Sequence, residues 1–159
     1  MKKMILLADD SIDDELFFKH VLKAAGVENP VHVVRDGKEV IAYLKGEGPY
    51  ADRERFPRPV VLFLDLSMPG MDGWEVLKWL QSQPNRKDLL VIVLAGSSQR
   101  RRLREVYEMG ANSFLFKPFS KAELEGLIFH WPDAWTISKP EPPMPPPPPS
   151  QQPGNRPAI

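Results

Sequence analysis

Short apolar runs alternate along the chain with segments of helical spacing. The apolar runs are rich in Val, Ile, Leu and Phe, and they lie at residues 4–8, 31–35, 60–64, 89–94 and 113–116. Runs that are apolar on both faces of a strand are typical of a buried parallel sheet. Apolar spacing of three and four predicts helices over residues 12–26, 37–46, 72–82, 98–109 and 120–129. This alternation predicts an α/β doubly wound sandwich with five parallel strands and five helices.

Residues 46–59 show neither the apolar run of a strand nor the apolar spacing of a helix, so we predict a long surface loop there. A loop of this length is often functional. The alternative is a tolerated insertion that Tyr50 and Phe56 hold against the surface of the domain.

The composition divides the chain into unlike parts. The 159 residues include 21 basic and 21 acidic side chains, so the formal charge is zero. Ten of the 18 prolines lie in residues 139–159. We therefore expect a folded domain over residues 1–130, an extension over 131–138, and a disordered, proline-rich tail over 139–159. The tail is either a simple spacer or a polyproline II segment that binds an aromatic groove.

Charge and cysteine content exclude several classes of protein. A neutral domain is not expected to bind duplex DNA or an anionic membrane. No apolar run approaches the 18 residues of a membrane span, and the absence of cysteine excludes disulfides and thiolate chemistry. The expected location is the cytoplasm.

Acidic and basic side chains follow the predicted strands at their carboxyl ends. Asp9 and Asp10 follow the first strand, Asp65 ends the third, and Lys117 follows the fifth. In a parallel α/β sheet these ends meet at one edge, where ligands bind. Three carboxylates beside one ammonium leave an excess of negative charge, and oxygen ligands without His or Cys favour Mg²⁺.

Asp65 is the candidate phosphoacceptor. It stands between a buried strand and a turn with exposed N–H groups, where a carboxylate can accept a phosphoryl group as an acyl phosphate. An aspartate-nucleophile phosphatase would also need an acid two residues later, but that residue is Ser67. The chain lacks the glycine-rich motifs that bind dinucleotides or nucleoside triphosphates.

These motifs resemble the receiver domain of bacterial two-component response regulators over residues 4 to about 130. The matching segments are Asp9-Asp10, Asp65-Leu-Ser-Met-Pro-Gly-Met-Asp-Gly, Gly110-Ala-Asn and Phe116-Lys-Pro. Three further features resemble the single-domain subgroup partnered with phytochrome-type histidine kinases. They are Gly48-Pro-Tyr-Ala-Asp in the long loop, Tyr107-Glu-Met-Gly-Ala-Asn-Ser, and the terminal His130-Trp131.

The resemblance implies a flavodoxin-like fold with strand order 2-1-3-4-5. It implies that a histidine kinase phosphorylates Asp65 and that Lys117 contacts the phosphoryl group. It implies Mg²⁺ ligation by Asp10, Asp65 and the Ser67 backbone carbonyl, with Asp9 acting through water, and a cis peptide before Pro118. Such a protein relays a signal to an unknown downstream protein and is not a turnover enzyme on an external substrate.

Residue 95 departs from the family pattern. Receivers carry Ser or Thr there, whereas this chain has Ala95, which cannot donate the hydrogen bond of about 1.5–3 kcal/mol to a charged acceptor. Phe114 occupies the aromatic switch position of the family. Without a hydroxyl at residue 95, the link between a phosphoryl group on Asp65 and the Phe114 side chain is weakened, unless Ser97 supplies the hydroxyl. The alternative function is a receiver-fold interaction module that works without phosphorylation.

Two further features concern partners. Arg100, Arg101, Arg102 and Arg104 form a basic cluster on the predicted fourth helix, which is either a solvated face or a surface for an acidic protein or a second copy. Trp131 and Trp135 pack either onto the domain or across a homodimer interface.

Substitution of Ala95 tests the weakened link. We expect Ala95→Thr to enlarge the conformational change on phosphorylation, measured by NMR shifts away from Asp65, because the threonine hydroxyl can bind the phosphoryl group. Equal responses from the variant and the parent protein would contradict this expectation.

Overall fold

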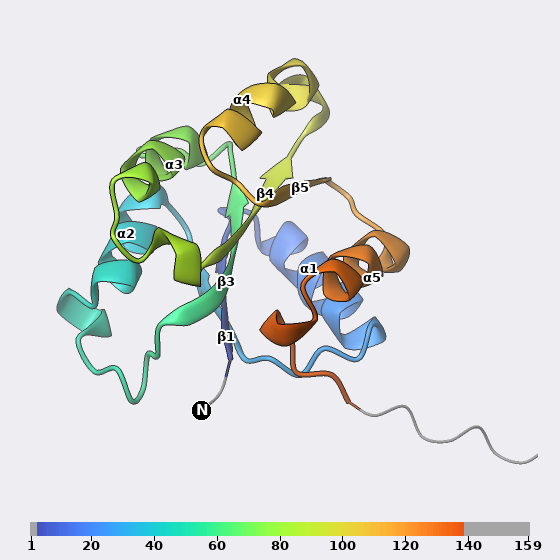
Figure 1. Ribbon diagram of the computed structural model, residues 1–159, viewed down its shortest axis with the longest axis horizontal. Coiled ribbons are helices and arrows are strands. Elements are labelled where there is room, and N and C mark those ends of the chain that lie inside the picture. The colour runs from blue at the N-terminus through green and yellow to red at the C-terminus, as the bar shows by residue number, and fades with distance from the viewer. Residues whose placement is uncertain (1–2, 139–159) are drawn as a thin grey trace, which may run out of the picture.

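The computed structural model describes residues 3–138 and builds them around one parallel sheet (Figure 1). The strands are β1 (Met4–Ala8), β2 (Val31–Val34), β3 (Pro59–Asp65), β4 (Leu90–Ala95) and β5 (Ser113–Phe116). Their order is β2-β1-β3-β4-β5, and all four pairings are parallel. The predicted flavodoxin-like arrangement is therefore confirmed. The predicted tail, residues 139–159, lies outside the described residues.

Helices cover both faces of the sheet. Helices α1 (Ile12–Ala24) and α5 (Lys121–His130) pack on one face. The other face carries α2 (Gly37–Lys45), α3 (Gly73–Gln81) and α4 (Leu103–Glu108) (Figure 1). Ser11, Asp36, Asp72 and Ser120 accept hydrogen bonds at the starts of α1, α2, α3 and α5, which explains why these helices begin there. Within residues 3–138, no helix has the length and apolarity needed to cross a bilayer.

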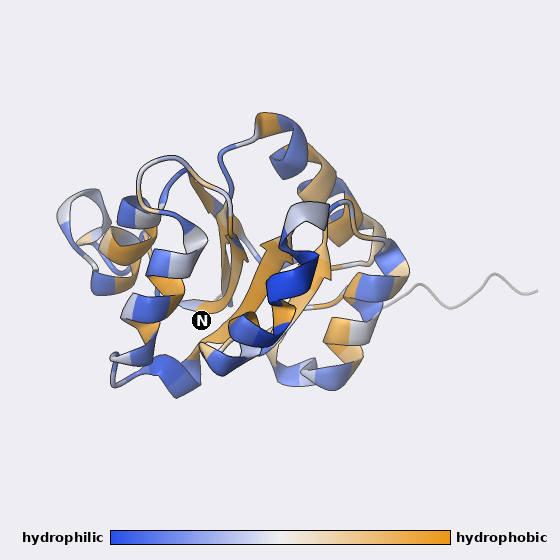
Figure 2. Ribbon diagram, turned by 90° about the horizontal axis from the view of Figure 1, so that it is seen from above, coloured by the Kyte–Doolittle hydropathy of each residue, from blue (hydrophilic) through white to orange (hydrophobic). Residues whose placement is uncertain are grey.

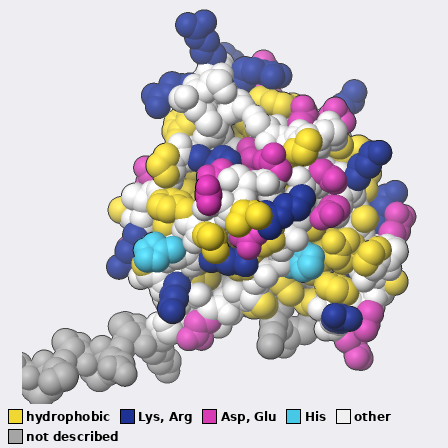
Figure 3. Space-filling view, turned by 180° about the vertical axis from the view of Figure 1, so that it is seen from behind, with side chains coloured by type: hydrophobic (Ala, Val, Ile, Leu, Met, Phe, Trp, Pro, Cys, Tyr) yellow, Lys and Arg dark blue, Asp and Glu magenta, His cyan; other side chains and the backbone are white. Residues whose placement is uncertain are grey.

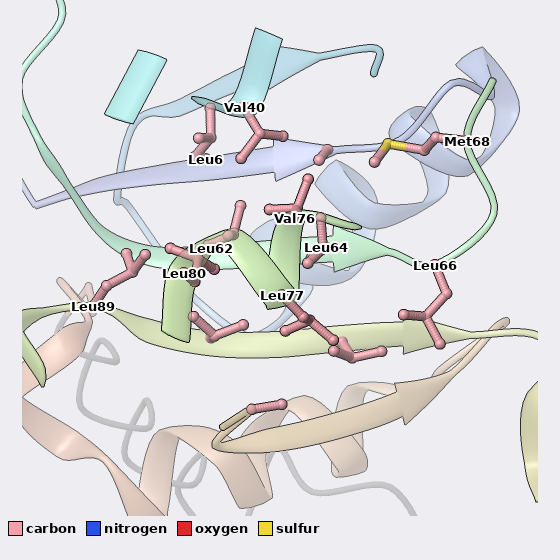
Figure 4. Close-up of a cluster of buried hydrophobic side chains, with 14 of the residues drawn as sticks. Leu6, Val40, Leu62, Leu64, Leu66, Met68, Val76, Leu77, Leu80 and Leu89 are labelled. Carbon is pink, nitrogen blue, oxygen red and sulfur yellow. The ribbon is translucent and has the colours of Figure 1, made fainter. Parts of the chain in front are cut away.

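Alternate side chains of each strand enter two separate cores. Figure 2 shows the sheet as a hydrophobic layer between helices whose outer surfaces are hydrophilic. Leu6, Leu62 and Leu64 pack toward α2 and α3, where Val76 and Leu77 close the core (Figure 4). Their neighbours in the strands face α1 and α5 instead. Burial on both faces explains why the strands are continuously apolar and why their ends can be read from the sequence.

The predicted fourth helix differs from the observed one. Residues Ser97–Arg102 form a 3₁₀ helix, η3, and the α-helix begins only at Leu103. Gln99 tightens this turn twice, since its N–H donates to the Gly96 carbonyl at 3.1 Å and its side-chain oxygen accepts from the Gly96 N–H at 2.6 Å. The guanidinium of Arg102 then lies 3.9 Å from the Trp74 ring centroid on α3. These side-chain contacts compete with α-helical geometry, which the spacing of apolar residues does not reveal.

The loop between α2 and β3 is held down by aromatic rings. Tyr50 and Phe56 pack edge to face with centroids 5.2 Å apart, and both contact the ring of His32. The Tyr43 hydroxyl donates to the Pro57 carbonyl at 2.9 Å. Burial in this cluster lowers the pKa of His32. The loop is therefore anchored through Tyr50 and Phe56. This agrees with the alternative stated from the sequence, in which these two rings hold the loop against the surface of the domain.

The segment after α5 folds back onto the domain. The ring of Trp135 is buried in the core below α1 and α5, with its centroid 6.1 Å from that of Phe63. The buried side chain of Asn29 donates to the Lys3 and Ala134 carbonyls and accepts from the Thr136 N–H. Of the two positions considered for Trp135, the structure shows packing within the domain.

Removal of the Trp135 ring tests this packing. We expect Trp135→Ala to lower the free energy of unfolding by about 3–5 kcal/mol, measured by urea denaturation, because it empties a filled site in the core. The matched control is Phe129→Ala, since Phe129 is 88% exposed and its loss is expected to change stability by about 0.5 kcal/mol or less. Equal losses in both variants would show that the extension does not contribute to the core.

Candidate functional site

Three strand ends bring the predicted acids and the lysine together. Asp9 follows β1, Asp65 ends β3, and Lys117 follows β5. The Lys117 ammonium donates to Asp9 Oδ2 at 3.1 Å and to Asp65 Oδ2 at 3.0 Å. The Lys117–Pro118 peptide is cis, as the sequence resemblance implies. The parallel sheet thus assembles a cluster whose members are more than 50 residues apart in the chain.

A third carboxylate, which the sequence analysis missed, also binds the lysine. Asp14 Oδ2 lies 2.8 Å from Lys117 Nζ, the shortest of the three distances. Asp14 stands in the first turn of α1 and donates its own N–H to the Ser11 hydroxyl. Acidic residues are common in the first turn of a helix because a negative charge there interacts favourably with the positive end of the helix dipole. Because this explanation accounts for an acid at position 14, the sequence alone does not reveal that Asp14 also pairs with Lys117.

Backbone N–H groups fix the orientation of two carboxylates. The Ser67 N–H donates to Asp65 Oδ1 at 3.0 Å, and the Ser11 N–H donates to Asp9 Oδ1 at 2.9 Å. Each carboxylate therefore has one oxygen bound to the backbone and the other bound to Lys117. The approach of Gly73 explains why the turn after Asp65 can be so tight, since a Cβ at Gly73 would lie 2.4 Å from the Asp65 carbonyl oxygen.

Burial and charge act in opposite directions on Asp65. Only 3% of this residue is exposed, and burial raises the pKa of its carboxyl group. The Ser67 N–H and Lys117 lower that pKa without cancelling the effect of burial. Burial would also lower the pKa of Lys117, but its hydrogen bonds to Asp14 and Asp65 outweigh burial and raise the pKa instead. Lys117 is therefore a permanent cation, and the acids around it outnumber it.

The acidic cluster fits a divalent cation. Asp9, Asp10 and Asp65 each place a carboxylate oxygen within 4.8 Å of the others. All of these donors are hard oxygens, which suit Mg²⁺ or a similar ion. Asp9 and Asp65 are both buried, and each already binds Lys117 through one carboxylate oxygen. Asp10 is exposed and open to an ion that enters from solvent.

The structure places the residues that the sequence suggested as the response to phosphorylation, which are Ala95, Ser97 and Phe114. Ala95 is fully buried as the last residue of β4. Phe114 is half-buried, packed edge to face against Tyr107 and Phe116. The Ser97 residue is exposed, and it is the side chain of Gln99 that reaches the Asp65 turn, donating to the Ser67 hydroxyl at 2.7 Å. Gln99 was not singled out from the sequence because nothing in its local pattern marks it.

The basic cluster proposed from the sequence is largely engaged in contacts with its neighbours. Arg104 pairs with Glu108 at 3.2 Å, and Arg102 pairs with Glu105 at 2.9 Å. The guanidinium of Arg100 lies 4.7 Å from the Phe116 ring centroid. Figure 3 shows basic and acidic side chains intermixed over the face of the molecule opposite to that of Figure 1. This mixture agrees with the zero net charge of the chain.

Comparison with known proteins identifies the family. Residues 5–129 match the response regulator receiver domain, and the chain belongs to that family. Response regulator Rcp1 from Synechocystis is 32% identical over 139 residues, which cover 85% of this chain and 92% of Rcp1.

Solved structures of similar proteins agree with this placement. The bacteriophytochrome response regulator RtBRR is 31% identical with a TM-score of 0.76, over 90% of this chain and 86% of that one. The phosphorylated cyanobacterial phytochrome response regulator RcpA is 31% identical with a TM-score of 0.71, over 87% and 100%. An Mn²⁺-bound structure of Rcp1 aligns with a TM-score of 0.70 and 31% identity, over 86% and 99%. Two of these similar proteins, RtBRR and RcpA, are thus phytochrome response regulators, and a third, Rcp1, binds Mn²⁺.

Removal of the Asp65 charge tests the electrostatics of the site. The raised pKa means that ionised Asp65 destabilises the folded state, so the folded protein binds a proton here more readily than the unfolded chain. We expect Asp65→Asn to raise the free energy of unfolding at pH 7 in metal-free buffer, because the neutral amide does not carry the cost of burying a charge. The gain should shrink as the pH falls through the raised pKa, because the wild-type carboxyl group then becomes neutral as well.

Thermal or urea unfolding at several pH values measures this effect. Asp133→Asn is the control, since it neutralises an exposed carboxylate far from Lys117. A loss of stability in Asp65→Asn at pH 7 would mean that the ion pair with Lys117 outweighs burial.

Proposed function

We propose that the protein is a cytoplasmic, stand-alone phosphoacceptor that takes a phosphoryl group on Asp65 from a sensor histidine kinase of the phytochrome type. The observation that carries the proposal is the buried Asp65 carboxylate, bound by Lys117 and placed within 4.8 Å of two further acids. The kind of kinase is proposed from the phytochrome response regulators that the chain resembles. The protein would act as a signal carrier and not as an enzyme on an external substrate.

The chemistry would be a transfer between two side chains. An Asp65 oxygen attacks the phosphorus of a phosphohistidine, the P–N bond breaks, and the imidazole keeps the electron pair and takes up a proton. The Ser67 N–H holds one Asp65 oxygen, which limits rotation of the carboxylate. Lys117 lies where it can pair with a phosphoryl oxygen while it remains charged.

Asp9, Asp10 and Asp65 would hold Mg²⁺, with the Ser67 carbonyl as a further ligand. When bound, the ion neutralises charge on the phosphoryl oxygens. Asp14 adds a constraint that these ligands do not supply. It must share Lys117 with the incoming phosphoryl group, because three carboxylates already surround that ammonium.

The surface beside the acids offers a site for the kinase. Ile12, Leu16 and Phe17 on α1 are 65%, 60% and 41% exposed. They lie on the helix that begins two residues after Asp10, and Phe17 lines the same pocket as Asp9 and Lys117. Exposed apolar side chains grouped at one place favour a protein partner. A helix of the kinase that carries the phosphohistidine would bury them.

Ala95 favours a second function. With no hydroxyl at the end of β4, the fold could serve as an interaction module whose contacts do not depend on phosphorylation. The intact cluster of Asp9, Asp65 and Lys117 supports the phosphoacceptor instead, since burial disfavours the ionised form of Asp65, and a carboxylate kept in such a place is typical of a functional site. A downstream protein, or a second copy of the chain, would receive the signal.

Phosphotransfer is the direct test of the proposal. We expect radiolabel from autophosphorylated phytochrome-type histidine kinases to appear on the wild-type protein with Mg²⁺, and to be lost with EDTA or in Asp65→Asn. Asp72→Asn is a matched control, because it replaces a neighbouring helix-capping aspartate by another good capping residue. Label on Asp65→Asn would place the acceptor elsewhere, and no label on any variant would favour the interaction module.

A further inference from the structure

The side chain of Gln99 joins the two loops that border Asp65. Its Nε2 donates to the Ser67 hydroxyl on the β3–α3 loop at 2.7 Å. Its Oε1 accepts from the Gly96 N–H, which directly follows β4, at 2.6 Å. Ser67 is the same residue whose N–H holds Asp65 Oδ1. One amide therefore connects the orientation of the acceptor carboxylate to the start of η3.

The segment that begins with this link has an unusual geometry. A 3₁₀ run of six residues, Ser97–Arg102, is longer than the three or four residues that such helices normally reach, and long runs often mark hinges. At its far end Arg102 stacks on the Trp74 ring of α3. The 3₁₀ geometry is thus fixed at one end by Gln99 and at the other by Arg102. Loss of either contact leaves the segment free to adopt another conformation.

A phosphoryl group on Asp65 competes for the donors that Gln99 now engages. The group carries close to two negative charges and three acceptor oxygens. Asp65 pairs with Leu94 in the sheet, so its side chain extends beside the turn that contains the Gly96 N–H. A charged oxygen is a stronger acceptor than the neutral amide oxygen of Gln99. With Ala95 unable to donate, the Gly96 N–H and Gln99 Nε2 are two donors on this side of the site, and both are now engaged through Gln99.

We propose that Gln99 is a positioning residue that reports the state of Asp65 to η3 in place of a hydroxyl at residue 95. In the unphosphorylated protein it ties Ser67 to Gly96 and holds residues 97–102 in the 3₁₀ turn. When Asp65 carries a phosphoryl group, Gln99 gives up the Gly96 N–H, and the 3₁₀ segment rearranges together with the Arg102–Trp74 contact. The link that Gln99 makes between Ser67 and Gly96 does not depend on the proposed function. The rearrangement on phosphorylation of Asp65 rests on that function.

The experiment uses the full chain labelled with ¹⁵N, with Mg²⁺ and beryllofluoride as the probe. For wild type we expect beryllofluoride to shift the amide signals of Asp65 and Ser67 and also those of residues 96–102. In Gln99→Ala the shifts at Asp65 and Ser67 should remain, while those at 97–102 should fall to about half or less. Gln81→Ala, an exposed glutamine on α3, is the matched control and should respond as wild type does.

Two further measurements distinguish a positioning role from a merely structural one. Without the probe, the Gly96 amide should exchange with solvent about tenfold faster in Gln99→Ala, because it has lost its acceptor. The double variant Ala95→Thr/Gln99→Ala should regain the shifts at 97–102, because the new hydroxyl offers a second route from the phosphoryl mimic.

The outcomes separate the two proposals. Equal shifts at residues 97–102 in wild type and Gln99→Ala would overturn the role of Gln99 and leave the phosphoacceptor intact. Failure of beryllofluoride to bind wild type would overturn the phosphoacceptor, and unchanged Gly96 exchange in Gln99→Ala would then overturn the link as well. Failure of the double variant to regain the shifts would show that Gln99 acts only by supporting the loop.

Discussion

The site depends on one buried ammonium among carboxylates. Lys117 bonds to Asp9, Asp14 and Asp65, and these contacts join the ends of β1, β3 and β5 to the first turn of α1. Without the lysine, the acids would repel one another at the end of the sheet, and solvent would screen this repulsion poorly because Asp65 is buried. The order β2-β1-β3-β4-β5 places β1 and β3 side by side at the centre of the sheet, so their terminal acids necessarily meet.

This arrangement leaves the charges incompletely balanced. Three acids contact the one lysine, and the exposed Asp10 lies near two of them. Burial raises the pKa of Asp65, so its ionised form is disfavoured in the folded protein. A site that is unfavourable by itself gains most from ligands that complement it, such as a divalent cation or a phosphoryl group with its counterion. The hydrophobic cores on both faces of the sheet supply the stability that this edge lacks.

The sequence reveals those parts of the structure that arise from local pattern. Continuous apolar runs locate the strands, and the residue after each run identifies Asp9, Asp65 and Lys117. Asp14 cannot be found in this way, since its reach to Lys117 depends on how α1 is rotated after the Ser11 cap. Gln99 and the 3₁₀ turn escape for a similar reason, because they follow from side-chain contacts with Ser67 and Gly96 that are distant in sequence or irregular in geometry. Sequence alone also left two positions for Trp135, which only the packing of the extension resolves.

The extension also determines where the chain leaves the domain. The Ser138 N–H donates to the Gly26 carbonyl at 2.9 Å, and Ile137 pairs with Val27 in an antiparallel bridge. Both partners lie between α1 and β2, at the edge of the sheet where the strands begin, whereas Asp65 lies where they end (Figure 1). The described part of the chain therefore ends, at Ser138, on the side of the sheet remote from Asp65. A spectroscopic probe placed beside Ser138 would be a full strand length from Asp65, so it would report on the domain without entering the acidic cluster.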